Sequence, residues 1–424
     1  MRNYGMKVVM WSLLCSLLVV GLAGITSAQT TITYLTRLRA EQFGRQTFDW
    51  LAGEFSRQNP ELKVSFIDTT YDKLREDLLL RSQAGTPPDV TEPVASWIPS
   101  LAEAGILEPV RGYISDEYLA RYPGSMLQDG TIGGTLYTVP LWSGPITLFL
   151  NKDLAKQAGY KAEGPADIFE FKDMIADIGS LGATAEGEEI YGFALRNVKS
   201  HNSALWFMTW LWAWGGKLVD AYDKPVFDSE GARRALGFYQ WLTAEGYSAK
   251  GADHYPTRIT FSQGRAGFIF DGPWLRGMLR DITGGDEVDD MYVPVTVPRG
   301  WDGTNWSISN YSDMVVLSGS KKKDAAFRFL EFMTSDEELV KRLHEVMGLM
   351  PAAYDMLAQP WAEDPYLEAF KEQNPYARGV PWKHAKWPGA QDFIARALTD
   401  AVAGRDVADV ARGVQRDMVD LMSE

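Results

Sequence analysis

Three short runs near the start of the chain read TITYL at residues 31–35, LKVSFI at 62–67 and DV at 89–90. The first two alternate in polarity or carry β-branched residues, which is typical of β-strands. The segments between the runs have the apolar spacing of amphipathic helices, one ending near Asn59-Pro60 and one covering residues 71–83. This order of strand, helix, strand, helix, strand predicts parallel strands joined by helical crossovers, and hence an α/β fold.

Polar side chains follow these predicted strands. Ligands of parallel α/β sheets bind beside the carboxyl ends of the strands, and here those ends lie near Arg37, Asp68 and Glu92. A later apolar run, Gly267–Phe270, is followed by Asp271 in the same way. We therefore expect these four side chains to contact a ligand; a solvated loop charge or a helix cap is the alternative for each.

The N-terminus has the pattern of a signal peptide. Arg2 and Lys7 precede an apolar run over residues 8–25, and the small residues Thr26-Ser27-Ala28 follow it. This pattern predicts that residues 1–28 are a signal peptide, cleaved after Ala28, and that the protein is secreted to a periplasm. A retained membrane anchor is the alternative, because the run is just long enough to span a bilayer.

Composition excludes several classes of function. The only cysteine is Cys15, which lies in the signal peptide, so disulfides and thiolate chemistry are not expected in the secreted chain. A lipid anchor on that cysteine is not expected either, because Leu14 rather than a small residue precedes it. The net charge of −14 argues against a nucleic-acid partner. The four histidines are scattered without a metal-binding motif, and there is no phosphate-cradling Gly-Lys-Ser/Thr loop, so neither a metal nor a cofactor is expected.

A family resemblance extends over residues 31–424. It is carried by PDV at 88–90 with AGILEP at 104–109, GTLYTVP at 134–140 with LNKDLAKQAG at 150–159, FSQGRAGF at 261–268 before GPW at 272–274, and SKKKDAAF at 320–327 before GLMP at 348–351. In their order and spacing these segments resemble the family 1 extracellular solute-binding proteins of ATP-binding-cassette importers, the group that contains maltose- and trehalose-binding proteins.

Two places depart from the family pattern. The chain reads Ala166-Asp167-Ile168-Phe169 where the family often has a tryptophan-aspartate pair, and Asn310-Tyr311-Ser312-Asp313 where it often has two glycines. The second place is a cleft-facing loop in the family, which leaves room for a substrate other than maltose.

The resemblance implies a two-lobed periplasmic-binding-protein fold of type II. Each lobe would be a mainly parallel sheet flanked by helices, with chain crossings near Pro140-Leu141, Ser309–Tyr311 and Tyr354. The expected N-terminal lobe is residues 29–140 plus 311–354, and the expected C-terminal lobe is residues 141–310 plus 355–424. Such lobes close on a ligand by a hinge movement.

The resemblance also implies binding without catalysis. The expected protein is a monomeric receptor that binds a mono- or oligosaccharide and passes it to the transmembrane permease subunits of an importer and their ATPase. One alternative is a receptor for a polyol or a sugar phosphate such as glycerol phosphate, whose mark would be converging basic residues; Arg37, Arg258 and Arg276 are available near the predicted cleft. Another is a secreted carbohydrate-active enzyme, which would need a close carboxylate pair that no motif provides.

Aromatic residues suit the apolar faces of a sugar, while carboxylates, amides and arginines suit its hydroxyl rim. The chain has 15 tryptophans, more than its length predicts. Trp274 is the main candidate for stacking, because it sits in a Gly-Pro-Trp turn where family members resemble it with an aromatic. Trp142 and Tyr311 stand at predicted crossings, and Trp97 follows the third predicted strand, although helix packing is an alternative for Trp97.

A further group of tryptophans has a different expectation. Trp206, Trp210 and Trp214 recur every four residues and therefore share one helix face. We predict that this face packs into the core.

Overall fold

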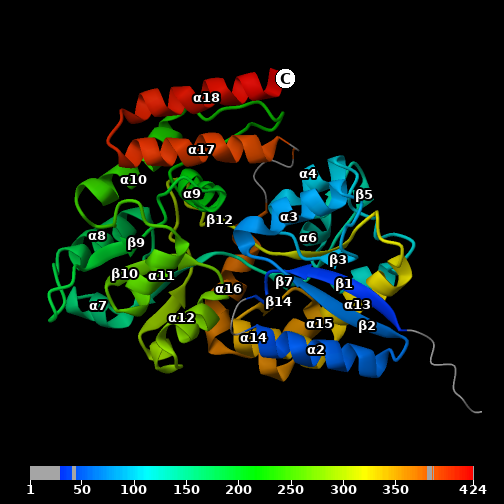
Figure 1. The fold of residues 1–424 in the computed structure, drawn as a ribbon. Helices are drawn as coiled ribbons and strands as arrows, with labels where there is room; N and C mark the ends of the chain where they lie inside the picture. Colours follow the sequence, from blue (N-terminus) through cyan, green and yellow to red (C-terminus); the bar gives the residue numbers. More distant parts are fainter. Residues whose placement is uncertain (1–28, 41–43, 380–383, 385, 424) are drawn as a thin grey trace, which may run out of the picture.

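The computed structural model describes residues 29–40, 44–379, 384 and 386–423. Figure 1 shows two large β-sheets on opposite sides of the molecule, each accompanied by helices, with the short strands β7 and β14 between them. This is the two-lobed α/β arrangement expected from the sequence. The predicted signal peptide and its cleavage site lie outside the described residues.

The first large sheet contains the three runs that open the folded chain. Its strand order is β2-β1-β3-β13-β6, and β1 pairs in parallel with both β2 and β3. Helices α2 and α3 connect these strands, which confirms the predicted strand–helix alternation. The elements are β1 (Thr30–Thr36), α2 (Arg45–Gln58), β2 (Leu62–Asp68), α3 (Tyr71–Gln83), β3 (Val90–Thr91), β6 (Val139–Pro140) and β13 (Asp313–Val316).

The second large sheet is more mixed than the sequence indicates. Its order is β11-β8-β10-β9; β9 pairs in parallel with β10, but β8 is antiparallel to both β10 and β11. Because β8 enters directly from the first lobe, no helical crossover sets its direction. The strands are β8 (Thr147–Asn151), β9 (Tyr191–Ala194), β10 (Ala266–Asp271) and β11 (Tyr292–Val295).

The chain passes between the two sheets in segments that meet at an antiparallel bridge between Pro145 and Ser309 and that pair with further short strands. One passage joins β6 to β8 and contains β7 (Trp142–Ser143); another joins β11 to β13 and contains β12 (Ser307–Ile308). Strand β7 pairs with β14 (Met350–Pro351), and β12 pairs with β15 (Ala377–Arg378). The passages are thus tied by backbone hydrogen bonds.

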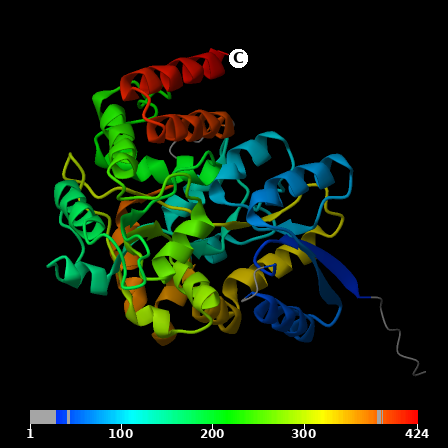
Figure 2. The ribbon, with the colours of Figure 1, turned by 60° about the vertical axis from the view of Figure 1, so that its left-hand side comes forward.

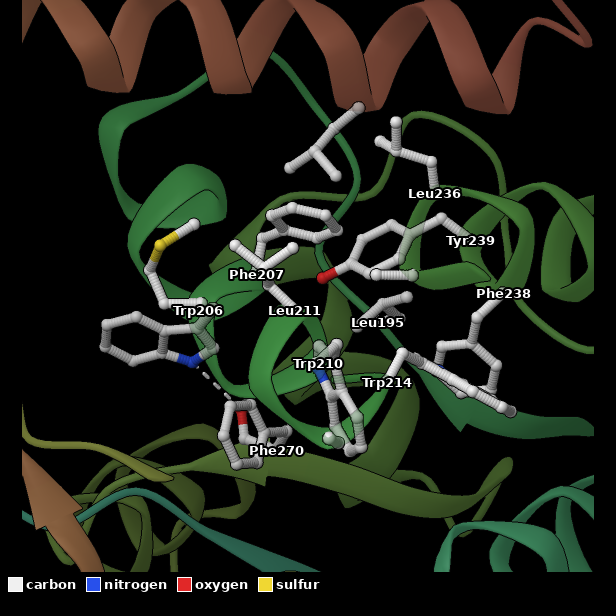
Figure 3. Close-up of a cluster of buried hydrophobic side chains, with 14 of the residues drawn as sticks. Leu195, Trp206, Phe207, Trp210, Leu211, Trp214, Leu236, Phe238, Tyr239 and Phe270 are labelled. Carbon is white, nitrogen blue, oxygen red and sulfur yellow. Dashed lines mark hydrogen bonds between the residues drawn. The ribbon is translucent and has the colours of Figure 1, made fainter. Parts of the chain in front are cut away.

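The tryptophan-rich helix α9 (His201–Ala213) forms the centre of the second lobe. Trp210 is fully buried and stacks on Phe171 with ring centroids 5.3 Å apart, while Trp206 and Trp214 are 2% and 7% exposed. Figure 3 shows these side chains packed among residues of α10 (Glu230–Ala244). The prediction that this face belongs to the core is confirmed, although Trp206 also borders the cavity described below.

Two long C-terminal helices cover the second lobe. In Figures 1 and 2, α17 (Trp387–Val402) and α18 (Val407–Ser423) lie at the top, and α17 contacts both α9 and α10. No helix of the described residues is long and apolar enough to cross a membrane. The remaining regular elements are α4 (Ile98–Glu103), α5 (Asp116–Leu119), α6 (Gly124–Asp129), β4 (Thr131–Ile132), β5 (Thr135–Leu136), α7 (Lys152–Gln157), α8 (Ile168–Gly179), α11 (His254–Ser262), α12 (Leu275–Thr283), α13 (Lys323–Ser335), α14 (Glu337–Met347), α15 (Tyr354–Leu357) and α16 (Glu368–Gln373), with short 3₁₀ turns between several of them.

Candidate binding site between the lobes

A cavity of about 100 Å³ lies where the two lobes face each other. Both lobes and the passages between them contribute to its wall, which combines aromatic rings with polar side chains. The lining residues are Arg37, Leu38, Tyr71, Val94, Trp142, Arg196, Asn202, Trp206, His254, Arg258, Trp274, Met278, Asn310, Tyr311, Ser312, Met347 and Leu349.

Four of the side chains expected from the sequence meet at this cavity: Trp274, Trp142, Tyr311 and Arg37. Trp142 and Tyr311 belong to the passages, which explains why residues 169 positions apart in the chain share one wall. The Tyr311 hydroxyl donates to Asp129 Oδ2 at 2.8 Å, and this hydrogen bond fixes the position of the Tyr311 ring.

Trp274 is held in place by a buried carboxylate and by two glycines. Its indole Nε1 donates to Asp271 Oδ1 at 2.9 Å. A Cβ at Gly272 would lie 2.3 Å from the indole, and one at Gly144 would lie 3.1 Å from it. Gly272 therefore has to be glycine for the indole to occupy this position, and Gly144 has to be glycine mainly because its Cβ would lie 2.1 Å from the Asn310 carbonyl oxygen.

Asp271 supports the cavity wall without lining it. It is fully buried and accepts from Arg196 Nη2 at 2.7 Å, from Arg258 Nε and Nη2 at 2.9 and 3.2 Å, and from the Gly272 amide at 2.8 Å. Burial opposes ionisation, but the charges of Arg258 and Arg196 outweigh it and hold the pKa of Asp271 at about 2. Asp271 is thus an anion that fixes the two arginines and Trp274.

Glu92 has a similar role beneath Arg37. It is fully buried, and its Oε1 accepts from the Thr36 hydroxyl at 3.0 Å and from the Arg37 amide at 2.9 Å. Burial raises the pKa of Glu92 to about 7, although Arg37 partly offsets this effect. The Arg37 guanidinium donates from Nη2 to the Ser312 hydroxyl at 2.9 Å and lies over the rings of Tyr71 and Trp142, 5.1 and 5.5 Å from their centroids.

Besides Asp271 and Glu92, two further expected residues do not line the cavity. Asp68 ends β2, the outer strand of the first sheet, so its side chain lies one strand further from the second lobe and pairs with Arg39 at 2.7 Å. Trp97 is buried against Tyr71, with centroids 5.9 Å apart, and lines a neighbouring cavity of about 300 Å³. Tyr71, Asn202 and His254 border both cavities, and the Tyr71 hydroxyl donates to Asn202 Oδ1 at 2.9 Å across the lobes.

Part of the polar wall consists of residues that were not predicted from the sequence, namely Arg196, Asn202 and His254. Arg196 follows the apolar residues of β9, so its place just after a strand could have predicted it, as it did for Arg37 and Glu92. Asn202 and His254 lie at the first residues of helices, a position that carries no signal of its own. Arg276, one of the basic residues available near the predicted cleft, instead pairs with Asp364 and lies over Tyr366 outside the cavity lining.

A larger hollow of about 790 Å³ borders the other side of Tyr311 and is lined in part by Trp212, Trp306 and Arg378. Its lining reaches Gly379, next to residues 380–383, which lie outside the described chain. The smaller cavity is the better defined site, because strand ends of both sheets and the passages converge on it.

The fold and the cavity define a two-lobed ligand receptor of the type II periplasmic-binding-protein class. Residues 44–339 match the model of the family described as bacterial extracellular solute-binding protein, which covers more than half of the chain. The chain belongs to this family, as the resemblance in its sequence predicted.

Individual relatives agree with this assignment. A putative binding protein of Brucella abortus is 23% identical over 399 residues, which cover 92% of this chain and 94% of that protein. A maltotriose-binding protein of Pyrococcus abyssi is 26% identical over 363 residues, 84% of this chain and 75% of the relative. The tagatose-bound solute-binding protein of Thermotoga lettingae has a TM-score of 0.81 at 23% identity, covering 92% of this chain and all of its own. The GacH receptor of Streptomyces glaucescens has a TM-score of 0.82 at 22% identity, and the match covers 93% of this chain and 99% of the GacH chain. These structures share the fold.

Proposed function

We propose that the protein is the substrate-binding component of a carbohydrate importer of the ATP-binding-cassette class. The observation that carries this proposal is the convergence of Trp142, Trp206, Trp274 and Tyr311 with guanidinium and amide groups in one cavity between the lobes. Flat aromatic faces suit the C–H faces of a sugar, and the polar groups suit its hydroxyls. Relatives that include a maltotriose-binding protein and a galactooligosaccharide-binding protein support a saccharide as the ligand.

Closure of the lobes is the proposed mechanism. A ligand that touches both walls stabilises the closed form by its differential affinity for that form. The hydrogen bond from Tyr71 to Asn202 already joins the lobes at the cavity edge. The closed receptor, acting as a monomer in the periplasm, then docks on the permease subunits. The lobe boundaries proposed for this movement are residues 29–140 plus 311–354 and residues 141–310 plus 355–424.

Catalysis is not part of the proposal. A glycosidase needs two carboxyl groups that face the sugar. None of the described residues that line the cavity is Asp or Glu. Asp271 and Glu92 do not line it: Asp271 accepts from two arginine side chains, and Glu92 Oε1 accepts from the Thr36 hydroxyl and the Arg37 amide.

A ligand screen tests the proposal. The protein without residues 1–28 is heated with a panel of sugars, polyols, sugar acids and sugar phosphates. A specific ligand in excess raises the melting temperature, because it binds only the folded state. Calorimetric titration of each hit then measures Kd and stoichiometry, expected at one per chain. A panel in which no member shifts the melting temperature overturns the proposal.

A further inference from the structure

We propose that the solute is a monosaccharide carrying an anionic group, a carboxylate or a phosphate, and that Arg37, Arg196 and Arg258 bind this group. The inference rests on the proposed function and narrows its substrate class. Three guanidiniums line one small cavity, and none of the described lining residues is acidic.

The charges in the wall are not balanced. Arg196 and Arg258 share a single carboxylate, that of Asp271, although both are nearly fully buried. Within the described residues Arg37 makes no ion pair, although the Glu92 carboxyl beneath it offsets part of its charge. Its Nη2 donates to a neutral hydroxyl, and its Nε is buried without an acceptor. The wall therefore carries positive charge in excess of its own carboxylates.

This excess is local and opposes the charge of the whole chain. The protein has a net charge of −14, so the positive cavity is not a result of composition. Burying unpaired cations costs free energy. Burial lowers the pKa of Arg196 to about 10 against the attraction of Asp271, which expresses this cost. A bound anion removes the imbalance.

Two of the three arginines also lie against aromatic rings. The Arg37 guanidinium lies over Tyr71 and Trp142, and that of Arg196 lies 4.7 Å from the Trp206 ring centroid. Aromatic faces hold a planar guanidinium in position, and its fork of N–H groups matches the two oxygens of a carboxylate or phosphate. Trp274 remains as a surface for the sugar ring.

The size of the cavity limits the ligand. The cavity has a volume of about 100 Å³, which is well above the space that a single water needs but small for a binding site. That is the scale of one sugar ring and its substituents. A chain of several sugars requires the lobes to separate at Tyr71 and Asn202.

The test compares sugars that differ only in charge. Calorimetric titrations use glucose and galactose, their uronic and aldonic acids, and their 6-phosphates. We expect at least one anionic sugar to bind about 10- to 100-fold tighter than its neutral parent, the gain typical of charge-assisted hydrogen bonds. The acid and phosphate arms identify which anion is preferred. Raising the ionic strength should lower the affinity for the anionic sugar and leave the affinity for the neutral sugar unchanged.

Variants connect the preference to the arginine. Arg37→Gln removes a cation that makes no ion pair, so the fold is expected to survive, and circular dichroism checks this. It should weaken binding of the anionic ligand about tenfold or more, and weaken binding of the neutral parent by a smaller factor, because the neutral sugar loses a hydrogen-bond donor but no charge pairing. Arg111→Gln, at a side chain 70% exposed, is the matched control and should bind like the unmodified protein.

The outcomes separate the two proposals. If a neutral sugar binds tightly and its anionic forms do not, the proposal of an anionic solute is wrong, while the proposal of a saccharide receptor stands. Equal affinity of Arg37→Gln and the unmodified protein for an anionic sugar overturns the role of Arg37. Binding of no carbohydrate at all overturns the proposed function itself.

Discussion

Replacing Asp271 with Asn removes the charge that holds two buried arginines and Trp274 together. Asp271 is fully buried, and Arg196 and Arg258 are 4% and 7% exposed. The amide of Asn can replace only part of the acceptor capacity, and it leaves two guanidiniums without their shared anion. Removing one partner of a buried ion pair costs about 3–5 kcal/mol of unfolding free energy. We expect a loss of about 3 kcal/mol, because Arg196 keeps its contact with Trp206.

The pH dependence provides an independent check. The pKa of Asp271 lies at about 2 in the folded protein, below its ordinary 3.8. Its contribution is therefore fully present above about 3.8 and is lost as the pH falls through about 2. The difference in stability between Asp271→Asn and the unmodified protein should be largest near neutral pH and shrink in acid.

Urea unfolding followed by tryptophan fluorescence at several pH values measures both effects. Asp68→Asn serves as the control, since its exposed ion pair with Arg39 should be worth about 1 kcal/mol or less. If Asp271→Asn unfolds at the same urea concentration as the unmodified protein at neutral pH, the reasoning about this carboxylate is wrong.

Three other changes test the site. Trp274→Ala should raise the Kd of the bound saccharide at least about tenfold with an unchanged circular dichroism spectrum; unchanged affinity removes Trp274 from the site. Tyr71→Phe removes the hydroxyl that donates to Asn202 and so destabilises the closed form. It should weaken ligand binding by about 1 kcal/mol. Equal affinity of the two proteins in a calorimetric titration contradicts this expectation. The pKa of Glu92 is raised from 4.5 to about 7, so the stability that its protonated form contributes is lost as the pH rises through about 7. Glu92→Gln should therefore match the stability of the unmodified protein near pH 4.5. At pH 8 it should be more stable than the unmodified protein by roughly 3 kcal/mol. Unfolding curves that show no gain at pH 8 would refute it.

The sequence predicts the fold well because its signals are local. The runs that became β1, β2 and β3 alternate or are β-branched, and the helices between them have clear spacing and stop signals. The direction of β8 had no such signal. It is set by where the chain enters the second lobe, a tertiary fact that no window of residues contains.

The site was predictable in part. Trp274 and Tyr311 line the cavity because a turn and a passage fix their surroundings, whereas Asp68 lies away from it because its strand is the outer one. Strand order depends on packing of the whole lobe, so every strand end looks alike in the sequence. The direction in which Glu92 points was equally hidden, since one residue of register turns a side chain to the opposite face.

Glu92 and Asp271 show what the strand-end rule identifies in this protein. Both carboxylates stand at strand ends, and both turn inward: one holds the backbone of Arg37, the other the side chains of Arg196 and Arg258. The groups left facing the cavity are cations. A neutral sugar offers these cations hydroxyl oxygens but no charge, and it leaves the imbalance of the wall in place. Discrimination between neutral and acidic sugars then follows from the cost of unpaired buried charge, which distinguishes ligands more sharply than an added contact does.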